Sequence, residues 1–344
     1  MCMSVPPFVS VITPFYNTHS YLVECIESVL SQTYHVREYI LVDNCSDDGS
    51  TQIAEDYAAR FPEKIRLIHT SSFLSQVANF NFALSSISPE SKYCKIVQAD
   101  DWLYPECLER QVDLAESDES VGIVSSYRLK GTRVLGDGLP YTQSILAGRD
   151  LCRLQLTTST FLFGTPTTVL YRSEVVRSVS PFYDERTFYD DSDVCYRILQ
   201  SWNFGFVHQI LSFSRVDDDS IRGRILHFGP DLLDTFLQLT KFGPIYLQPD
   251  ELRPTLSKTT AAYYRFLARS RLAGRNNAFW QFHISGLSSV GLSIRKQLLL
   301  KHLFLELLRL LANPGLTVST LYHRLRSRKP ENGSRYASLP NVPD

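Results

Sequence analysis

The stretch Val9–Thr13 (VSVIT) begins the pattern that decides the fold of this 344-residue chain. Its β-branched and apolar residues predict a buried strand, and Pro14 marks the end of it because proline cannot donate to a neighbouring strand. A helix is predicted over residues 21–32, where apolar residues recur with the spacing of one helix face. A strand followed by a helix that covers it is the first unit of an alternating α/β pattern.

The same alternation continues to residue 125 through short connections. Further strands are expected at residues 39–42, 65–68, 93–97 and 121–125, and helices at residues 51–61, 76–86 and 105–117. This order predicts a Rossmann-like, doubly wound, mostly parallel sheet with helices on both faces. Because ligands bind such sheets at the carboxyl ends of the strands, polar residues that follow a strand are the first candidates for a site.

Composition excludes several classes of protein. With 35 Lys and Arg against 36 Asp and Glu the formal net charge is −1, whereas a dedicated nucleic-acid binder would carry a basic surplus. The seven cysteines form no CxxC pair and are odd in number, which argues against a disulfide framework or a structural zinc site and favours a reducing compartment. Neither a signal peptide nor a transmembrane span is evident, so a cytoplasmic location is expected.

Two adjacent acids, Asp100 and Asp101, follow the strand predicted at residues 93–97. Paired carboxylates at a strand end suit a hard divalent cation, which prefers oxygen ligands and also binds diphosphate oxygens. The alternative is structural, since either acid can solvate the turn or cap the next helix. The pair alone does not decide between these two interpretations.

Two further acidic clusters have similar alternatives. Asp43 ends the strand at residues 39–42, where it can accept hydrogen bonds from a base or ribose or serve the turn alone. Asp190 and Asp191 begin a helix, where the macrodipole favours carboxylates for structural reasons. A carboxylate fixed there can also accept the proton of an attacking hydroxyl. Arg197, about two turns further on, is expected to lock this helix to its neighbours.

Taken together, these segments resemble glycosyltransferase family 2, whose members have the GT-A fold. The resemblance is carried by residues 9–17 (VSVITPFYN), the Asp43 turn, the Asp100–Asp101 pair, and Asp190 and Asp191 with Arg197, in that order and spacing. It spans roughly residues 7–222 and implies an inverting enzyme that moves a sugar from a UDP- or GDP-linked donor to an acceptor hydroxyl. It also implies a divalent metal cofactor, Mn²⁺ or Mg²⁺.

The resemblance also assigns roles to individual residues. Positions that bind the donor are matched by Pro14, Tyr16 and Asp43 at the nucleoside, Asp100 near the ribose and donor sugar, and Arg215 and Ser220 at the diphosphate. Asp101 matches the last acid of the metal-binding motif, and Asp191 matches the general base. The acceptor side is matched by Gly164, Thr165, Pro166 and Asp190, the last of which stands in place of the usual Glu.

The chain also departs from the family pattern. Gln98 stands where the metal motif often has its first acid, and Asn44 stands where a second acid often follows Asp43. Asp217 replaces a histidine that often lies two residues after the position of Arg215. Neutralisation of the diphosphate is therefore expected to rest on the metal and on Arg215 or Arg222.

The implied domain organisation has three parts. We expect a catalytic domain at 7–225 (donor half 7–125, acceptor half 126–225), a helical region at 226–328 and a disordered tail at 329–344. A leucine-rich, basic stretch at residues 293–311 has two interpretations. It packs on the catalytic domain, or it makes peripheral contact with the inner face of the plasma membrane, where a lipid-linked saccharide acceptor would lie.

Two rival functions share part of this pattern. A nucleotidyltransferase can share the sheet and the acid pair, but a Gly-rich phosphate loop is expected after its first strand, and residues 13–18 contain none. A sugar-nucleotide-binding protein without transfer activity would keep the pocket acids and would not need Asp191. A glycosyltransferase of cell-surface glycan biosynthesis, acting on a saccharide or lipid-linked saccharide, is the favoured interpretation.

Overall fold

The computed structural model describes residues 6–158, 160–186, 190–216 and 225–313, and it divides the chain into two compact units, Met1–Leu256 and Ser257–Asp344. The first unit runs beyond the expected catalytic domain, because α9 (Pro230–Tyr246) packs against α5 (Gly148–Thr158). The expected division at residue 125 stays a prediction. The tail expected at 329–344 lies outside the described residues.

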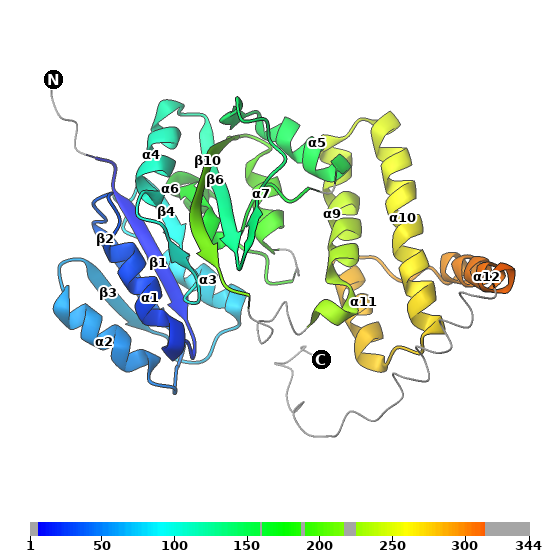
Figure 1. The fold of residues 1–344 in the computed structure, drawn as a ribbon, viewed down its shortest axis with the longest axis horizontal. Helices are drawn as coiled ribbons and strands as arrows, with labels where there is room; N and C mark the ends of the chain where they lie inside the picture. The colour runs from blue at the N-terminus through cyan, green and yellow to red at the C-terminus, as the bar shows by residue number, and fades with distance from the viewer. Residues whose placement is uncertain (1–5, 159, 187–189, 217–224, 314–344) are drawn as a thin grey trace. The chain divides into compact units, whose positions relative to one another are not determined.

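A mixed sheet forms the centre of the first unit (Figure 1). In chain order the described strands are β1 (Val9–Phe15), β2 (Glu38–Asp43), β3 (Ile65–His69), β4 (Tyr93–Ile96), β5 (Trp102–Leu103), β6 (Val121–Lys130), β7 (Arg133–Leu135), β8 (Ile145–Leu146), β9 (Leu170–Arg172) and β10 (Asn203–Ser214). Their order across the sheet is β3-β2-β1-β4-β9-β6-β10-β5, with β7 paired to β6 and β8 paired to β10.

The long strands of the sheet run parallel, as the sequence predicted. β1 lies between β2 and β4, and Ile12 is in register with both Ile40 and Ile96. β6 and β10 form a second parallel pair, while the short β9 lies antiparallel between β4 and β6. All seven residues of β1 are buried, including the two hydroxyl residues Ser10 and Thr13, so the strand shows no strict alternation of apolar and polar residues.

Helices cover both faces of this sheet. Those of the first unit are α1 (His19–Leu30), α2 (Ser50–Arg60), α3 (Gln76–Ser85), α4 (Cys107–Ser117), α5, α6 (Ser173–Ser178), α7 (Asp190–Ile198), the short η1 (Pro166–Thr168) and η2 (Leu226–Phe228), and α9. The buried face of α1 contains Leu22, Cys25, Ile26 and Val29 at helical spacing. These residues join Val11 of β1 in the main hydrophobic core.

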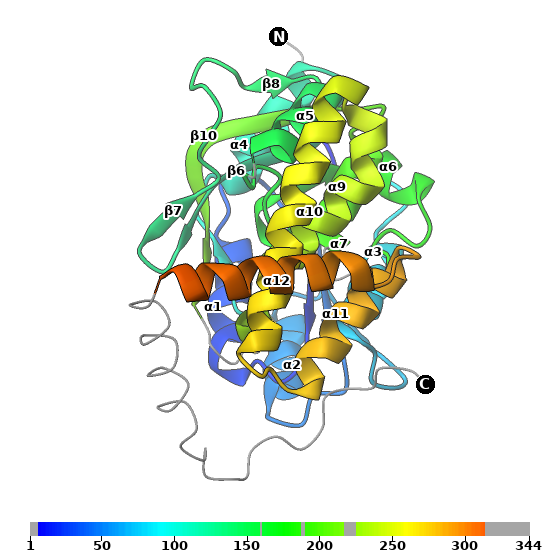
Figure 2. The same ribbon diagram turned by 90° about the vertical axis from the view of Figure 1, so that its right-hand side faces the viewer.

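The second unit is helical. It contains most of α10 (Pro249–Leu272), then α11 (Asn277–Ser289) and α12 (Lys296–Ala312). Tyr263 of α10 and His283 of α11 are fully buried, and the Tyr263 hydroxyl lies 3.0 Å from His283 Nδ1. α12 lies across α10 (Figure 2). No helix in the described part of the chain is long and apolar enough to cross a bilayer.

Candidate active site

Asp43 stands at the carboxyl end of β2 with its carboxylate 3% exposed. One oxygen accepts a hydrogen bond from the amide of Ser46 (3.0 Å). The other accepts from the Thr51 hydroxyl (2.7 Å) and lies 3.3 Å from His69 Nδ1. The carboxylate is thus fixed in one orientation at the edge of the sheet where β1 also ends.

The loop after β1 is joined to the turn after Asp43. Asn17 has a φ of 51°, and its side-chain amide exchanges hydrogen bonds with Asp47, donating at 2.7 Å and accepting at 2.9 Å. Pro14 is buried within β1, whereas Tyr16 is 45% exposed and meets the ring of Phe73 edge-on, with centroids 4.8 Å apart. Two exposed aromatic rings therefore lie close together in this loop region.

Asn44 stands where the family pattern often has a second acid, and its contacts give a structural reason for this difference. The buried side-chain amide donates to the carbonyl of Leu74 (2.9 Å) and accepts from the amide of the same residue (2.9 Å). An aspartate cannot make both bonds, because an ionised carboxylate has no donor. Asn44 thereby holds the loop that contains Phe73. Nothing in the local sequence pattern marks Leu74 as its partner.

Asp101 lies where three segments of the first unit meet. Its Oδ2 accepts hydrogen bonds from the hydroxyls of Thr167 (2.6 Å) and Ser214 (3.2 Å), and its Oδ1 accepts from the amide of Arg215 (3.3 Å). The side chain is 4% exposed. Burial, with a smaller contribution from the charge of Asp100, raises the pKa of Asp101 to about 7.

Thr167 is a site residue that the sequence analysis missed. Its fully buried hydroxyl donates to Asp101 and accepts from the amide of Gln98 (3.1 Å), so it connects both ends of the acidic loop to η1. Behind η1, the buried Lys95 donates to the carbonyl of Val169 (3.3 Å), and Gln111 donates to that of Thr168 (2.6 Å). These contacts fix η1 against the end of β4.

Gly164, Thr165 and Pro166 lead into η1 as a tight turn. Gly164 has a φ of +93°, and a Cβ placed on it would lie 2.0 Å from Thr168 Oγ1 and 2.7 Å from Ser125 Oγ. The Thr168 hydroxyl also accepts from the amide of Thr165 (2.8 Å). Only glycine fits this turn, for reasons of both backbone conformation and space.

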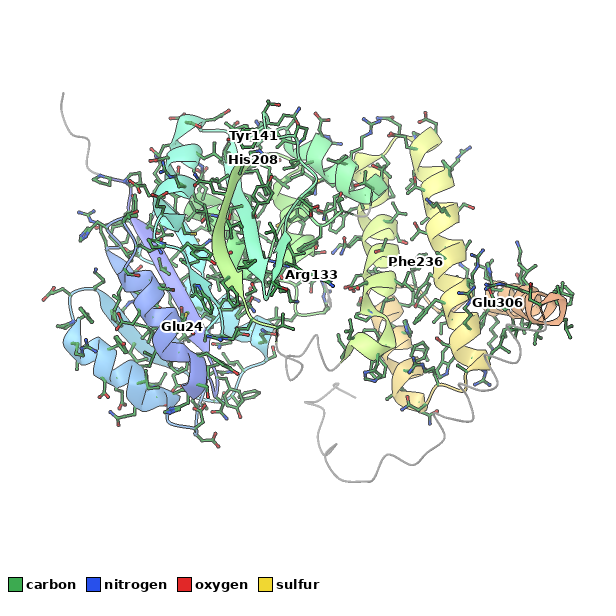
Figure 3. All side chains as sticks on the ribbon, in the orientation of Figure 1. Glu24, Arg133, Tyr141, His208, Phe236 and Glu306 are labelled. Carbon is green, nitrogen blue, oxygen red and sulfur yellow. The ribbon has the colours of Figure 1, made fainter. Side chains whose placement is uncertain are left out.

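Arg215 is held by its side chain as well as by its backbone. The guanidinium pairs with Glu24 of α1, which is labelled in Figure 3, and lies over the rings of Tyr21 (4.4 Å) and Trp102 (5.1 Å). Its amide contacts Asp101, so the end of β10 is joined to the acidic loop. Ser220 and Arg222, which were predicted near the diphosphate, lie outside the described residues.

The helix α7 contains Asp190 and Asp191 in its first turn. Asp191 is half-buried, and its negative charge adds to the effect of burial in raising the pKa of both Tyr171 and Cys195. Two residues later, the fully buried Asp193 pairs with Arg197 of the same helix (2.9 Å) and also with Lys241 of α9.

The acid pair after β4 fits a divalent cation in part. Among the described residues no group of three or more His, Cys, Asp or Glu side chains is placed to bind a metal. Asp100 and Asp101 are two carboxylates that repel each other, and a cation would relieve this repulsion. A hard cation held by two protein carboxylates would complete its shell with water and donor oxygens. That Asp101 is a metal ligand stays a prediction.

Comparisons with known proteins show the family and the fold of this chain. A sequence model of "Glycosyl transferase family 2" matches residues 10–179, which include Asp43, Asp101 and η1. Residues 10–179 form a glycosyltransferase family 2 domain. This glycosyltransferase is 28% identical to the putative glycosyltransferase EpsE of Bacillus subtilis over 239 residues, or 67% of the chain and 80% of EpsE.

Other relatives and solved structures extend the comparison. The putative teichuronic acid biosynthesis glycosyltransferase TuaG of Bacillus subtilis is 30% identical over 42% of this chain, and the match spans 55% of TuaG. S. aureus TarS shares the fold with a TM-score of 0.56 at 16% identity, over 82% of this chain and 79% of the TarS chain. The mannosyltransferase PcManGT from Pyrobaculum calidifontis shares it at 0.52, over 83% and 86% of the two chains. These likenesses confirm the GT-A fold.

Proposed function

We propose that this glycosyltransferase moves a sugar from a nucleotide-diphosphate donor to an acceptor hydroxyl with inversion at the anomeric carbon. The observation that carries the proposal is the convergence at Asp101. The acidic loop after β4, η1 and the end of β10 are all hydrogen-bonded to this one carboxylate. A donor bound at the acidic loop would therefore face the loop through which the acceptor is expected to approach.

The donor half of the proposal rests on the strand ends of β1 and β2. The fixed carboxylate of Asp43 has lone pairs left to accept a hydrogen bond from a base or ribose. The exposed pair Tyr16 and Phe73 offers aromatic surface to the base. Structures of TarS with UDP-GlcNAc and of PcManGT with GDP-Man and Mn²⁺ support a UDP- or GDP-linked sugar as the donor class.

The chemical step needs one base. Asp191 would take the proton of the acceptor hydroxyl, which attacks the anomeric carbon as the bond to the diphosphate breaks. A single displacement from the face opposite the leaving group inverts the configuration, and no carboxylate is needed as a nucleophile. Arg215 would pair with the diphosphate if it exchanged Glu24 for that partner.

A divalent metal is the cofactor we propose for Asp100 and Asp101. When bound, such a cation supplies charge stabilisation to the leaving diphosphate. Of the protein groups, Asp101 would be held in place by Thr167 and Ser214, and Asp100 would lie on the donor side of the loop. The replacement of the family's first acid by Gln98 removes one negative charge, so we expect weak metal affinity in the absence of donor.

The acceptor is proposed to be a saccharide or a lipid-linked saccharide of the cell surface. Relatives named for teichuronic acid and minor teichoic acid biosynthesis support this class. The acceptor-side turn at Gly164 lies beside Arg128 and Phe161, and the guanidinium of Arg128 lies over the Phe161 ring (6.0 Å). We propose a cytoplasmic location with access to the inner face of the plasma membrane.

The test is transfer by the purified chain. UDP- and GDP-sugars would be incubated with Mn²⁺ and a panel of saccharide acceptors, and the anomeric configuration of the product would be read by NMR. We expect a product of inverted configuration and loss of turnover with a chelator. A retained configuration would contradict the single displacement. Tight donor binding without transfer or donor hydrolysis would favour a sugar-nucleotide-binding protein.

A further inference from the structure

The near-neutral chain is made of two oppositely charged units. Residues 257–344 contain 14 Lys and Arg but only 3 Asp and Glu. Residues 1–256 contain 21 Lys and Arg and 33 Asp and Glu. The formal net charges are therefore +11 and −12. A small helical unit with such a surplus is attracted to anionic surfaces.

α12 faces the rest of its own unit with polar side chains. Its two buried residues are His302 and Glu306, the second of which is labelled in Figure 3. Glu306 is the only acid in α12, and it pairs with Arg269 of α10 at 3.1 Å and with Arg309 at 3.4 Å. The only negative charge of α12 is therefore paired with arginines of the same unit.

The opposite side of α12 is an exposed apolar stripe. Its members recur with the spacing of one helix face: Leu300 (64% exposed), Phe304 (61%), Leu307 (46%), Leu308 (45%) and Leu311 (78%). The exposed Lys296 and Lys301 border the stripe on its two sides. A helix with its polar side inward and its apolar side outward needs a further surface to cover the apolar side.

We infer that α12 docks this chain on an anionic lipid bilayer. An apolar stripe between two lysines matches the interface of a membrane, where leucine and phenylalanine enter the acyl region and lysines reach the headgroups. The net charge of +11 favours anionic lipid, because each basic side chain near such a leaflet adds to the attraction. A second copy of the chain is a poorer occupant, since pairing through this face would bring two strongly positive units together. The inference does not depend on the proposed transfer reaction.

The test uses the full-length chain and vesicle flotation. Vesicles of equal parts phosphatidylglycerol and phosphatidylcholine should bind the protein at low salt, whereas pure phosphatidylcholine vesicles should bind it at least tenfold less. The double variant Lys296→Gln/Lys301→Gln should lower the partition coefficient roughly 30-fold, since two charges are removed from the leaflet. The double variant Phe304→Ser/Leu311→Ser should abolish flotation.

Matched controls separate docking from misfolding. Val134→Ser/Leu232→Ser removes two exposed apolar side chains from the first unit, and Lys258→Gln removes one exposed charge from α10. The first should leave flotation unchanged, and the second should change it less than the α12 charge variant. All variants should keep the wild-type melting temperature. Equal binding to both vesicle types, or no binding by the wild type, would overturn the inference. So would self-association that Phe304→Ser/Leu311→Ser abolishes, because the stripe would then join two copies.

Discussion

At the scale of single residues, Asp101 shows how a buried carboxylate can serve two purposes. Three protein donors fix its position, and burial beside Asp100 makes its ionised form costly. A bound cation would offset that cost. The same arrangement therefore holds three segments together and leaves the site with a deficit of positive charge.

The first prediction concerns Asp101→Asn and pH. The carboxyl has a pKa of about 7 in the folded chain against an ordinary value of 3.8, so the folded state binds this proton more tightly than the unfolded state. Its contribution to stability is complete below about pH 4 and is lost as the pH rises through 7. In chelator, urea unfolding should show that the wild type loses on the order of 4 kcal/mol relative to Asp101→Asn over this range. The exposed Asp113→Asn is the control, and a stability difference between wild type and Asp101→Asn that stays constant with pH would refute the assigned pKa.

The second prediction concerns the turn at Gly164. Gly164→Ala should lower both stability and transfer, because the added methyl group meets Thr168 Oγ1 and Ser125 Oγ as well as a φ of +93°. Gly274→Ala isolates the backbone effect, since Gly274 also has a positive φ (+73°) but no atom within 4 Å of its added Cβ. Gly274→Ala should cost about 1 kcal/mol, and Gly164→Ala clearly more. Equal loss of melting temperature in the two variants would show that the close contacts do not matter.

Site residues that follow a local sequence pattern were predictable, whereas those that act through distant partners were not. Asp43 and Asp101 follow apolar strands, so the alternating pattern alone puts them at the sheet edge. Thr167 and Asn44 act through partners that lie far away in sequence, 66 residues for Thr167 with Asp101 and 30 for Asn44 with Leu74. Such pairs depend on the tertiary arrangement, which no local pattern encodes.

At the scale of elements, α7 is held from two sides. Asp193 is fully buried and pairs with Arg197 in its own helix and with Lys241 of α9, a helix that lies beyond the matched residues 10–179 of the family. Arg197 also donates to the carbonyl of Phe182. The helix that carries Asp191 is thus positioned by α9, and both helices lie beyond residues 10–179, which the family model matches.

The third prediction tests this connection with Lys241→Met. Removing the lysine leaves the buried Asp193 to pair with Arg197 and should destabilise the chain by about 1–2 kcal/mol, a value reduced for the partial exposure of Lys241. We expect kcat to fall while the donor Kd is unchanged, since α7 carries the proposed base. Lys258→Met is the matched control. An unchanged kcat would contradict the role of Lys241 in positioning α7. So would an equal loss of kcat when Lys241→Met is made in the wild type and in an Asp193→Asn background.

The elements of the first 130 residues followed the sequence closely, whereas the later ones did not. β1 to β4 and α1 to α4 begin and end within a few residues of the predicted ranges, because each has a clear apolar period. β9 has three residues and lies antiparallel between β4 and β6, so its identity as a strand comes from its neighbours. No apolar period of its own marks β9 in the sequence, so it was not among the predicted strands.

At the scale of the whole molecule, charge and chemistry are divided between the two units. The predicted catalytic and donor-binding residues all belong to residues 1–256, which carry the negative surplus, and residues 257–344 carry the positive one. The near-zero net charge seen in the composition conceals this division. A donor that is itself a diphosphate anion would reach an acidic unit only where cations, Arg215 among them, compensate for the carboxylates.

The most direct test of the proposed function is Asp191→Asn in the full-length chain. The amide keeps the shape of the side chain but cannot accept a proton, so transfer should fall by about 10²–10⁴-fold. Calorimetric titration with the nucleotide-sugar donor should give an unchanged Kd, and Asp113→Asn should behave as the wild type. Transfer at a near wild-type rate by Asp191→Asn would contradict the assignment of Asp191 as the general base.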